Sequence, residues 1–250
     1  MARIRLDQLL VSRGLAPSRK RAHALILAGD VTVAGAPAAK AGQMVDAEAD
    51  VALRRPDHPW VSRGGVKLSH ALQTFAIDVG GLTVLDIGAS AGGFTDVLLA
   101  RGASRVVALD VGHAQLDWKL RTDPRVVCLE GVNARYLTAD ALPSGARSFD
   151  LITIDVAFIS LGHIFPVLPA LLAPGGRVLA LVKPQFEAGR ADVGPGGIVR
   201  DPDVHARVLD ATAAAAHQVG LEPIATTVSP IEGTRGNREF FMLFRAADRR

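Results

Sequence analysis

The chain has 250 residues, 49% of them hydrophobic and 21% charged, and its formal net charge is +3. This length suits one α/β domain with a small accessory module, and this composition excludes a wholly disordered chain. The single cysteine excludes an internal disulfide, and no apolar run reaches the roughly 20 residues that a membrane-spanning helix needs. We therefore expect a cytoplasmic protein without a membrane partner, and we favour a monomer.

The excess positive charge lies at the start of the chain. Residues 1–60 hold nine lysines and arginines against six acidic residues, and residues 1–25 hold six against one. Residues 61–250 hold 19 of each kind and are balanced. Such segregation favours a module that binds a polyanion, although a solvated basic face has the same composition.

The first 53 residues predict two short helices followed by a small sheet. Apolar residues from Leu6 to Val11 have the spacing of one helical face, and Gly14 ends that helix. A second helix follows, with Ser18 as its N-cap and Gly29 as its end. Short strands are expected at residues 31–33, around residue 45 and at residues 51–53.

Three cations, Arg19, Lys20 and Arg21, form the first turn of the second helix. The helix dipole disfavours cations there unless an anion such as a phosphate binds the same turn. Together with neighbouring cations they are candidate RNA contacts, and the full set is Arg3, Arg5, Arg13, Ser18, Arg19, Lys20, Arg21 and Arg63.

The string RLDQLLVSRGLAPSRKRAHALILAGDVTVAG, residues 5–35, resembles the αL RNA-binding motif. This small domain is shared by ribosomal small-subunit protein four and several RNA-modifying enzymes. The resemblance implies an α+β RNA-binding domain, whereas a basic helical hairpin that binds nothing is the alternative. Residues 54–59, RRPDHP, have the composition of a linker. We therefore expect one domain over residues 1–60 and a second over residues 61–250.

The second domain alternates strands with helices. Strands are expected at residues 82–87, 105–110, 126–129, 151–155, 177–183, 224–228 and 239–245, and helices at 94–100, 163–172 and 204–219. This order predicts a doubly wound, Rossmann-like α/β sheet with helices on both faces and ligands at the carboxyl ends of its strands. The last two strands follow each other without a helix, which predicts an edge hairpin of the kind found in class I methyltransferases.

A glycine-rich loop, DIGASAGGFT at residues 86–95, follows the first of these strands and opens a helix. It does not fit G-x-G-x-x-G and instead resembles the loop that binds S-adenosylmethionine. Asp110 ends the next strand, where a carboxylate can accept both ribose hydroxyls. The candidate cofactor-binding residues are Asp86, Gly88, Ala89, Ser90, Gly92, Gly93, Phe94, Asp110, Val111, Asn133 and Asp155. A purely structural glycine turn and NAD binding are the alternatives.

Four charged residues lie at element ends: Lys67, Asp155, Lys183 and Glu239. A charge at the end of an apolar strand needs a partner, because burying it unpaired is costly. Taken alone, the four side chains can simply form structural ion pairs.

As a set, these four residues are similar to the lysine–aspartate–lysine–glutamate constellation of FtsJ-like RNA ribose 2′-O-methyltransferases. With VSRGGVKL, DVAFISL, LVKPQFE and VGPGGIVRDP also present, the whole chain resembles the TlyA or haemolysin-A family. The resemblance implies S-adenosylmethionine-dependent methylation of cytidine ribose in ribosomal RNA. Lys183 would act on the 2′-hydroxyl, as base or as electrostatic stabiliser, with Lys67 supplying a second cation and Asp155 and Glu239 orienting the lysines. The linker and the short C-terminus depart from some relatives and leave the ribosomal subunit open.

Three other functions stay open: a non-catalytic RNA- or ribosome-binding protein, a pore-forming haemolysin, and a methyltransferase for small molecules or proteins. The histidines show no spacing for metal ligation, so we expect no metal. Trp60, Phe158 and Phe186 flank the predicted site and can stack on a flipped base, although we expect ordinary packing for each. We expect Cys128 to be a buried core residue.

Overall fold

The computed structural model describes residues 3–38, 40–54, 58–143, 146–233 and 235–247. The chain divides into two compact units, Met1–Pro59 and Trp60–Arg250, and each is described by itself. Residues 55–57, the middle of the expected linker, lie outside the described residues. Within the described ranges, no helix has the length and apolar character needed to cross a membrane.

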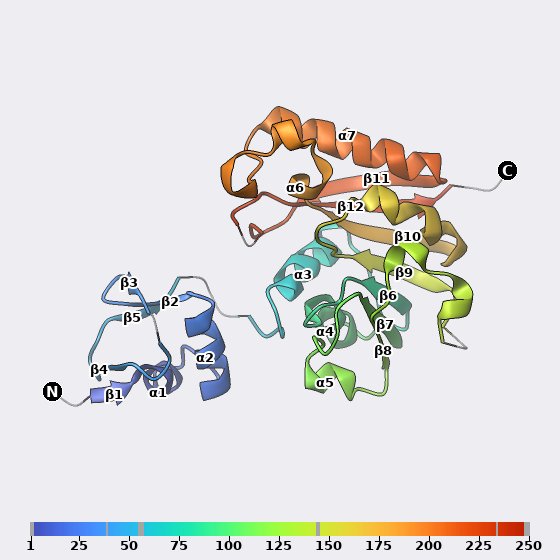
Figure 1. Cartoon of the computed structure of the whole chain (residues 1–250). Coiled ribbons are helices and arrows are strands. Elements are labelled where there is room, and N and C mark those ends of the chain that lie inside the picture. Colours follow the sequence, from blue (N-terminus) through green and yellow to red (C-terminus); the bar gives the residue numbers. More distant parts are fainter. Residues whose placement is uncertain (1–2, 39, 55–57, 144–145, 234, 248–250) are drawn as a thin grey trace. The chain divides into compact units, whose positions relative to one another are not determined.

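The first unit is a helical hairpin with short strands (Figure 1). Its elements are β1 (Arg3–Arg5), α1 (Leu6–Ser12), α2 (Arg19–Leu27), β2 (Val31–Val33), β3 (Ala36–Pro37), β4 (Met44–Asp46) and β5 (Val51–Leu53). The two predicted helices and the expected strands are confirmed. The Ser18 hydroxyl accepts the Arg21 N–H at 3.2 Å, which confirms the predicted N-cap. Strand β1, which was not predicted, pairs antiparallel with β4. The residue pattern of β1 alone does not indicate this pairing.

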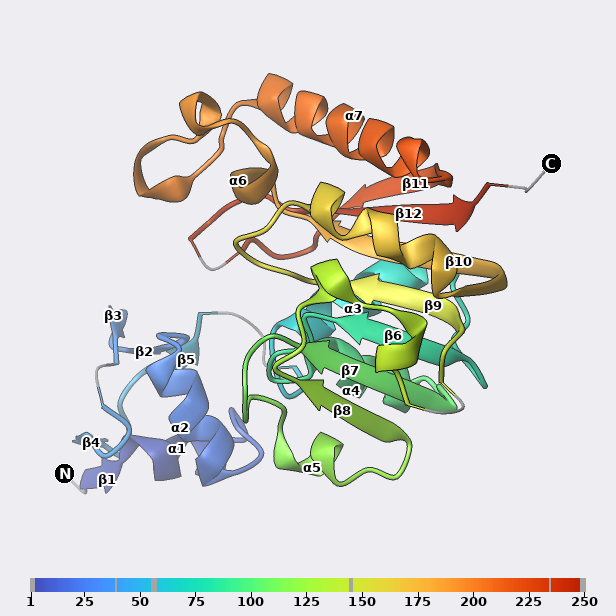
Figure 2. The ribbon, with the colours of Figure 1, turned by 45° about the vertical axis from the view of Figure 1, so that its right-hand side comes forward.

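The second unit holds one large sheet and its covering helices (Figure 2). Its strands are β6 (Thr83–Ile87), β7 (Arg105–Asp110), β8 (Val126–Glu130), β9 (Phe149–Ile154), β10 (Leu172–Val182), β11 (Leu221–Val228) and β12 (Phe240–Ala246). Its α-helices are α3 (Gly64–Thr74), α4 (Gly93–Ala100), α5 (Trp118–Arg121), α6 (Pro184–Glu187) and α7 (Pro202–Gln218). Short 3-10 turns lie at Ala134–Tyr136, Ala139–Ala141, Leu161–His163, Phe165–Ala170, Arg190–Asp192 and Pro195–Gly197.

The strand order of this seven-stranded sheet is β11-β12-β10-β9-β6-β7-β8. The five strands from β10 to β8 run parallel, whereas β12 runs antiparallel to both of its neighbours. The expected edge hairpin is therefore confirmed, with β12 inserted between β10 and β11. The predicted fold class, a class I methyltransferase sheet, is confirmed by this order.

Both faces of the sheet are covered, because successive residues of each strand point to opposite faces. On β12, for example, Phe244 packs with α7 and the 3-10 turns, whereas Leu243 packs with α3 and α4. These two apolar clusters hold the layers together and leave the carboxyl ends of the parallel strands to carry polar residues.

The expectations for residues 163–172 and for Cys128 were wrong. The expected helix at residues 163–172 is a pair of 3-10 turns followed by the start of β10, because Pro166 and Pro169 interrupt α-helical hydrogen bonding. Cys128 is only partly buried, since β8 is an edge strand of the sheet.

Candidate active site

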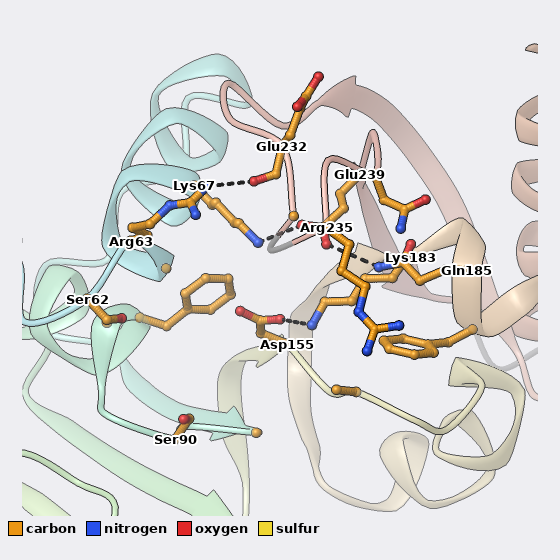
Figure 3. A pocket seen from close by; sticks show the side chains of 18 of the residues that line it. Ser62, Arg63, Lys67, Ser90, Asp155, Lys183, Gln185, Glu232, Arg235 and Glu239 are labelled. Carbon is orange, nitrogen blue, oxygen red and sulfur yellow. Dashed lines mark hydrogen bonds and ion pairs between the residues drawn. The ribbon is translucent and has the colours of Figure 1, made fainter. Parts of the chain in front are cut away.

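Lys67 and Glu239 form a buried ion pair between α3 and the residue directly before β12 (Figure 3). Lys67 Nζ lies 2.5 Å from Glu239 Oε2, and the two side chains are 11% and 3% exposed. The Gln185 amide donates to the other carboxylate oxygen at 3.5 Å. Each charge therefore has its partner inside the protein, as a buried charge requires.

Asp155 and Lys183 follow β9 and β10 directly, and these neighbouring strands are parallel. Their carboxyl ends therefore meet at the same edge of the sheet. Lys183 Nζ lies 2.5 Å from Asp155 Oδ1, with side-chain exposures of 12% and 20% (Figure 3). The structure thus pairs each of the four predicted charges with one partner of opposite sign.

Both ion pairs line one cavity of about 780 Å³. The glycine loop contributes Gly88, Ala89, Ser90, Gly93 and Phe94 to its wall. Ser62 and Arg63, directly before α3, and Gly64, its first residue, also line it. The remaining wall is formed by Ala157, Phe158, Gln185, Phe186, Gly197, Glu232, Gly233, Arg235 and Asn237. The predicted catalytic set and most of the predicted glycine loop therefore share one space.

The glycine loop passes so close to the chain around Asp155 that one position excludes any side chain. Gly88 has φ +83°, and a Cβ atom there would lie 2.4 Å from the Asp155 carbonyl oxygen. A larger residue would be strained by its backbone angle and would also push Asp155 away. Gly88 therefore sets the spacing between the loop and the Asp155–Lys183 pair.

Asp86 lies beneath the glycine loop rather than in the cavity wall. Its fully buried carboxylate accepts the Thr95 hydroxyl at 2.7 Å and the Thr153 hydroxyl at 2.9 Å. Burial raises the pKa of this carboxyl to about 6, against the lowering effect of the two hydroxyls. Asp86 thereby links Thr95, at the end of the glycine loop, to Thr153 of β9.

Asp110 holds the glycine loop from the other side. Its carboxylate accepts the Ser90 N–H at 2.8 Å and the Gly112 N–H at 2.7 Å. Val111 and Asn133 are exposed nearby on the loops after β7 and β8. None of these three residues lines the cavity, so the structure brings only part of the predicted cofactor set into it.

Sequence reasoning missed Gln185, Arg235 and Asn237, which line the cavity from segments next to predicted site residues. Asn237 is almost fully buried, accepts the Val199 N–H at 2.9 Å and donates to the Gly197 carbonyl at 2.8 Å. It ties the VGPGGIVRDP segment to the strand that follows Glu239. Gln185 lies within the LVKPQFE motif, two residues after Lys183, and this position was the sequence signal that could have identified it as a site residue.

The expected packing of Phe158 was wrong, because its side chain is 90% exposed and lines the cavity. Its ring centroid lies 5.1 Å from that of Phe186. Trp60 is half-buried and packs against the core, as expected. Phe158 is therefore an aromatic surface open to a ligand.

In the first unit, the predicted RNA-binding cations have different settings. Asp7, which is buried, pairs with Arg5 at 2.9 Å and Arg19 at 3.0 Å. Arg5 chiefly, together with Arg19, holds the pKa of this carboxyl well below its usual range. Arg5, Asp7, Arg19 and Lys20 line a hollow of about 540 Å³ with His23 and Lys40, which sequence reasoning did not select.

The other predicted cations donate to backbone or ring atoms. Arg3 donates to the Met44 carbonyl at 2.9 Å, Arg13 to those of Ala47 and Ala49, and Arg21 contacts His58. In the second unit, Arg63 donates to the Glu232 carbonyl at 2.7 Å at the rim of the cavity (Figure 3). No group of three or more histidines, cysteines or acidic residues is placed to hold a metal in the described part of the chain.

Comparison with known proteins decides the family. The model of the FtsJ-like methyltransferases matches residues 60–246, and that of the S4 domain matches residues 4–51. The chain belongs to the FtsJ-like methyltransferase family. The predicted resemblance, an αL or S4 module ahead of an FtsJ-like domain, is confirmed.

Relatives of this FtsJ-like methyltransferase align over nearly its whole length. The "16S/23S rRNA (cytidine-2'-O)-methyltransferase TlyA" of Mycobacterium tuberculosis is 48% identical over 97% of this chain and 90% of its own. "Hemolysin A" of Brachyspira hyodysenteriae is 41% identical over 96% of this chain and 99% of its own. A solved structure, "Putative hemolysin from Streptococcus thermophilus", is 42% identical with a TM-score of 0.78, covering 99% of this chain and 90% of that one.

Proposed function

We propose that this protein transfers a methyl group from S-adenosylmethionine to the ribose 2′-hydroxyl of a cytidine in ribosomal RNA. The observation that carries the proposal is the convergence of Lys67, Asp155, Lys183 and Glu239 beside a glycine loop in one cavity. The choice of cytidine as the target nucleotide and of ribosomal RNA as the substrate rests on the name of the Mycobacterium tuberculosis relative.

The glycine loop in the cavity wall and the residues beside the cavity fit the proposed cofactor. Gly88 and Gly93 carry no side chain, so that the backbone at these two positions can approach a methionine-like moiety. Asp110 has both oxygens near the loop, each with one backbone donor and further lone pairs for ribose hydroxyls. Val111 and Asn133 would flank the adenine, and Asp86 would support the loop without touching the ligand. When bound, S-adenosylmethionine supplies an already activated methyl group.

Lys183 is the residue assigned to the 2′-hydroxyl. Its Nζ lies 2.5 Å from Asp155 Oδ1, so the Lys183–Asp155 ion pair is placed to stabilise the negative charge that develops on the 2′-oxygen during methyl transfer. Asp155 orients Lys183, and the Lys67–Glu239 pair supports the opposite wall of the cavity. The arrangement supports alignment and charge stabilisation as the protein's chief contributions.

Phe158 is assigned to the target base. An exposed aromatic ring at the rim of the cavity can stack on a nucleotide that has been turned out of its helix. Arg63 and Arg235 line the same cavity and can contact the adjoining phosphates. These assignments supply the contacts that a ribose must have to be placed at Lys183.

The S4 unit is proposed to bind RNA phosphates through Arg5, Arg19 and Lys20, which line its hollow. Arg3, Arg13 and Arg21 extend this basic surface, and Ser18 caps the helix that carries it. Because Asp7 fixes two of these arginines, the unit presents them in a set orientation. We expect Arg19→Glu with Lys20→Glu to weaken binding to ribosomal RNA and to flatten its dependence on salt.

The test is Lys183→Ala, with methyl transfer to purified ribosomal subunits and cofactor binding by calorimetry measured on the same preparation. We expect transfer to be lost while the dissociation constant for S-adenosylmethionine stays within about threefold of the wild type. Glu222→Ala, which removes an exposed pair with Arg245, is the matched control and should retain full transfer. Full activity in Lys183→Ala would overturn the assignment, whereas cofactor binding without transfer in the wild type would favour the non-catalytic RNA-binding alternative.

A further inference from the structure

Phe158 has a backbone that a bulky residue rarely adopts. Its φ is +64°, in the left-handed region, and its side chain is 90% exposed. The conformation is strained for a residue with a Cβ atom, and an exposed ring gains little from burial. Contacts elsewhere in the segment must therefore hold Phe158 in place.

Those contacts come from Glu187, the last residue of α6. Its carboxylate accepts the Ser160 hydroxyl at 2.6 Å and the Leu161 N–H at 2.9 Å. The Ser160 oxygen in turn accepts the Gly162 N–H at 3.2 Å. The half-buried Glu187 carboxylate thus fixes Ser160 and Leu161, which follow the strained Phe158 by two and three residues. Hydrogen bonds to an ionised group are stronger than those between neutral groups.

The same short helix holds the segment at two further points. Phe186 lies against Phe158, with ring centroids 5.1 Å apart and planes at 51°. Lys183, directly before α6, pairs with Asp155 at the start of the segment. Residues 155–161 and 183–187 are therefore joined at both ends, with the exposed ring between the two attachments.

We propose that Glu187 is a positioning residue that holds Phe158 at the wall of the cavity, where its ring receives the base of the target nucleotide. The proposal rests on the proposed function, which supplies that nucleotide. Glu187 itself neither lines the cavity nor pairs with a cation among the contacts described here. Its carboxylate accepts hydrogen bonds from Ser160 and Leu161, in the segment that carries Phe158. Glu187 therefore acts on the reaction by fixing the position of the Phe158 ring.

A double-mutant cycle tests this coupling in the full-length protein. We expect Phe158→Ala to lower kcat/KM for the RNA about 10-fold, since a stacked base is lost. Glu187→Ala should give a similar loss, and the Glu187→Ala/Phe158→Ala protein should be no worse than Phe158→Ala alone. The dissociation constant for S-adenosylmethionine should stay unchanged in all three.

Two milder variants guard against a folding defect. Glu187→Gln retains an acceptor for the Leu161 N–H and should recover most of the activity. Ser160→Ala removes one of the two bonds and should lose about threefold, again with no added loss in the Phe158→Ala background. Glu222→Ala is the matched control, because its carboxylate also holds one partner in the same unit but far from the cavity lining.

The outcomes separate the two proposals. Full activity of Glu187→Ala, or losses that multiply in the double variant, would overturn the role of Glu187 while the wild type still methylates RNA. No methylation of RNA by the wild type would instead overturn the proposed function. A loss of cofactor binding in Glu187→Ala but not in Glu187→Gln would mean that Glu187 acts on the glycine loop, which also contradicts the proposal.

Discussion

The cation–carboxylate pairs that line the cavity of the methyltransferase unit and the hollow of the S4 unit differ in burial. In the pair of Lys67 and Glu239, which lines the cavity of the methyltransferase unit, both partners are largely buried, with Lys67 11% and Glu239 3% exposed. In the S4 unit only the carboxylate is buried, because Asp7 is 6% exposed whereas Arg5 and Arg19 are 43% and 56% exposed. A pair buried on both sides fixes the interior of a site, whereas a buried carboxylate under exposed arginines fixes a surface that can still bind an anion.

The largest effect is expected from breaking the doubly buried pair. Glu239→Gln leaves the Lys67 ammonium without its charged partner, which should lower the free energy of unfolding by about 3 kcal/mol. Lys67→Met combined with Glu239→Gln removes the unpaired charge and should recover most of that loss. Urea unfolding of both variants measures this, and equal losses in the two would contradict the account.

Asp86 should give the next largest effect, with a defined pH dependence. Its pKa is raised to about 6 by burial, so the folded state binds more protons than the unfolded state between about pH 4 and pH 6. The wild type therefore loses stability as the pH rises through this window. Asp86→Asn removes that loss, and its advantage over the wild type should grow by roughly 2 kcal/mol from pH 4 to pH 7.

The measurement is the difference in unfolding free energy between Asp86→Asn and the wild type at each pH. A difference that stays constant from pH 4 to pH 7 would show that the carboxylate is already ionised without penalty in the folded state. Asp201→Asn is a useful control, because this carboxylate caps α7 near the surface and lies outside the glycine loop.

Asp7→Asn should have a smaller effect, since its arginine partners are exposed to solvent and screened. The Arg5 and Arg19 guanidinium groups hold the pKa of Asp7 well below its usual range. Its stabilisation is therefore present above about pH 4 and is lost as the pH falls towards the folded pKa. We expect a loss of about 1 kcal/mol at pH 7, measured by hydrogen exchange of the α1 and α2 amides. A loss that is as large at pH 2 as at pH 7 would contradict an electrostatic origin.

The smallest effect is expected at the exposed pair of Glu222 and Arg245 on the outer hairpin, where the two side chains are 40% and 61% exposed. Glu222→Ala should change the free energy of unfolding by less than about 0.5 kcal/mol. Thermal unfolding measures this. A loss comparable with that of Glu239→Gln would mean that burial does not govern the strength of these pairs.

The sequence was sufficient to predict the elements and charges whose determinants are local. The strand ends carrying Asp155 and Lys183, the glycine loop and the N-cap at Ser18 follow from residue type and spacing. The predicted doubly wound sheet has its ligands at the carboxyl ends of its strands, and Asp155 and Lys183 lie at two such ends.

Features that depend on tertiary contacts could not be predicted in this way. Strand β1 exists only because it pairs with β4 some 40 residues later along the chain, as the Arg3–Asp46 register shows. Aromatic composition favoured packing for Phe158, but its exposure follows from a segment held by Glu187. The wrong expectation of a helix at residues 163–172 was avoidable, because Pro166 and Pro169 are visible in the sequence and proline interrupts α-helical hydrogen bonding.

In the proposed function, the Asp155–Lys183 pair serves methylation of a cytidine ribose. The most direct measurement incubates the wild type and Lys183→Ala with unmodified ribosomal subunits and methyl-deuterated S-adenosylmethionine, then digests the RNA for nucleoside mass spectrometry. We expect this function to give deuterated 2′-O-methylcytidine with the wild type and none with Lys183→Ala. Label in a base-methylated nucleoside, or equal 2′-O-methylcytidine with both proteins, would contradict it.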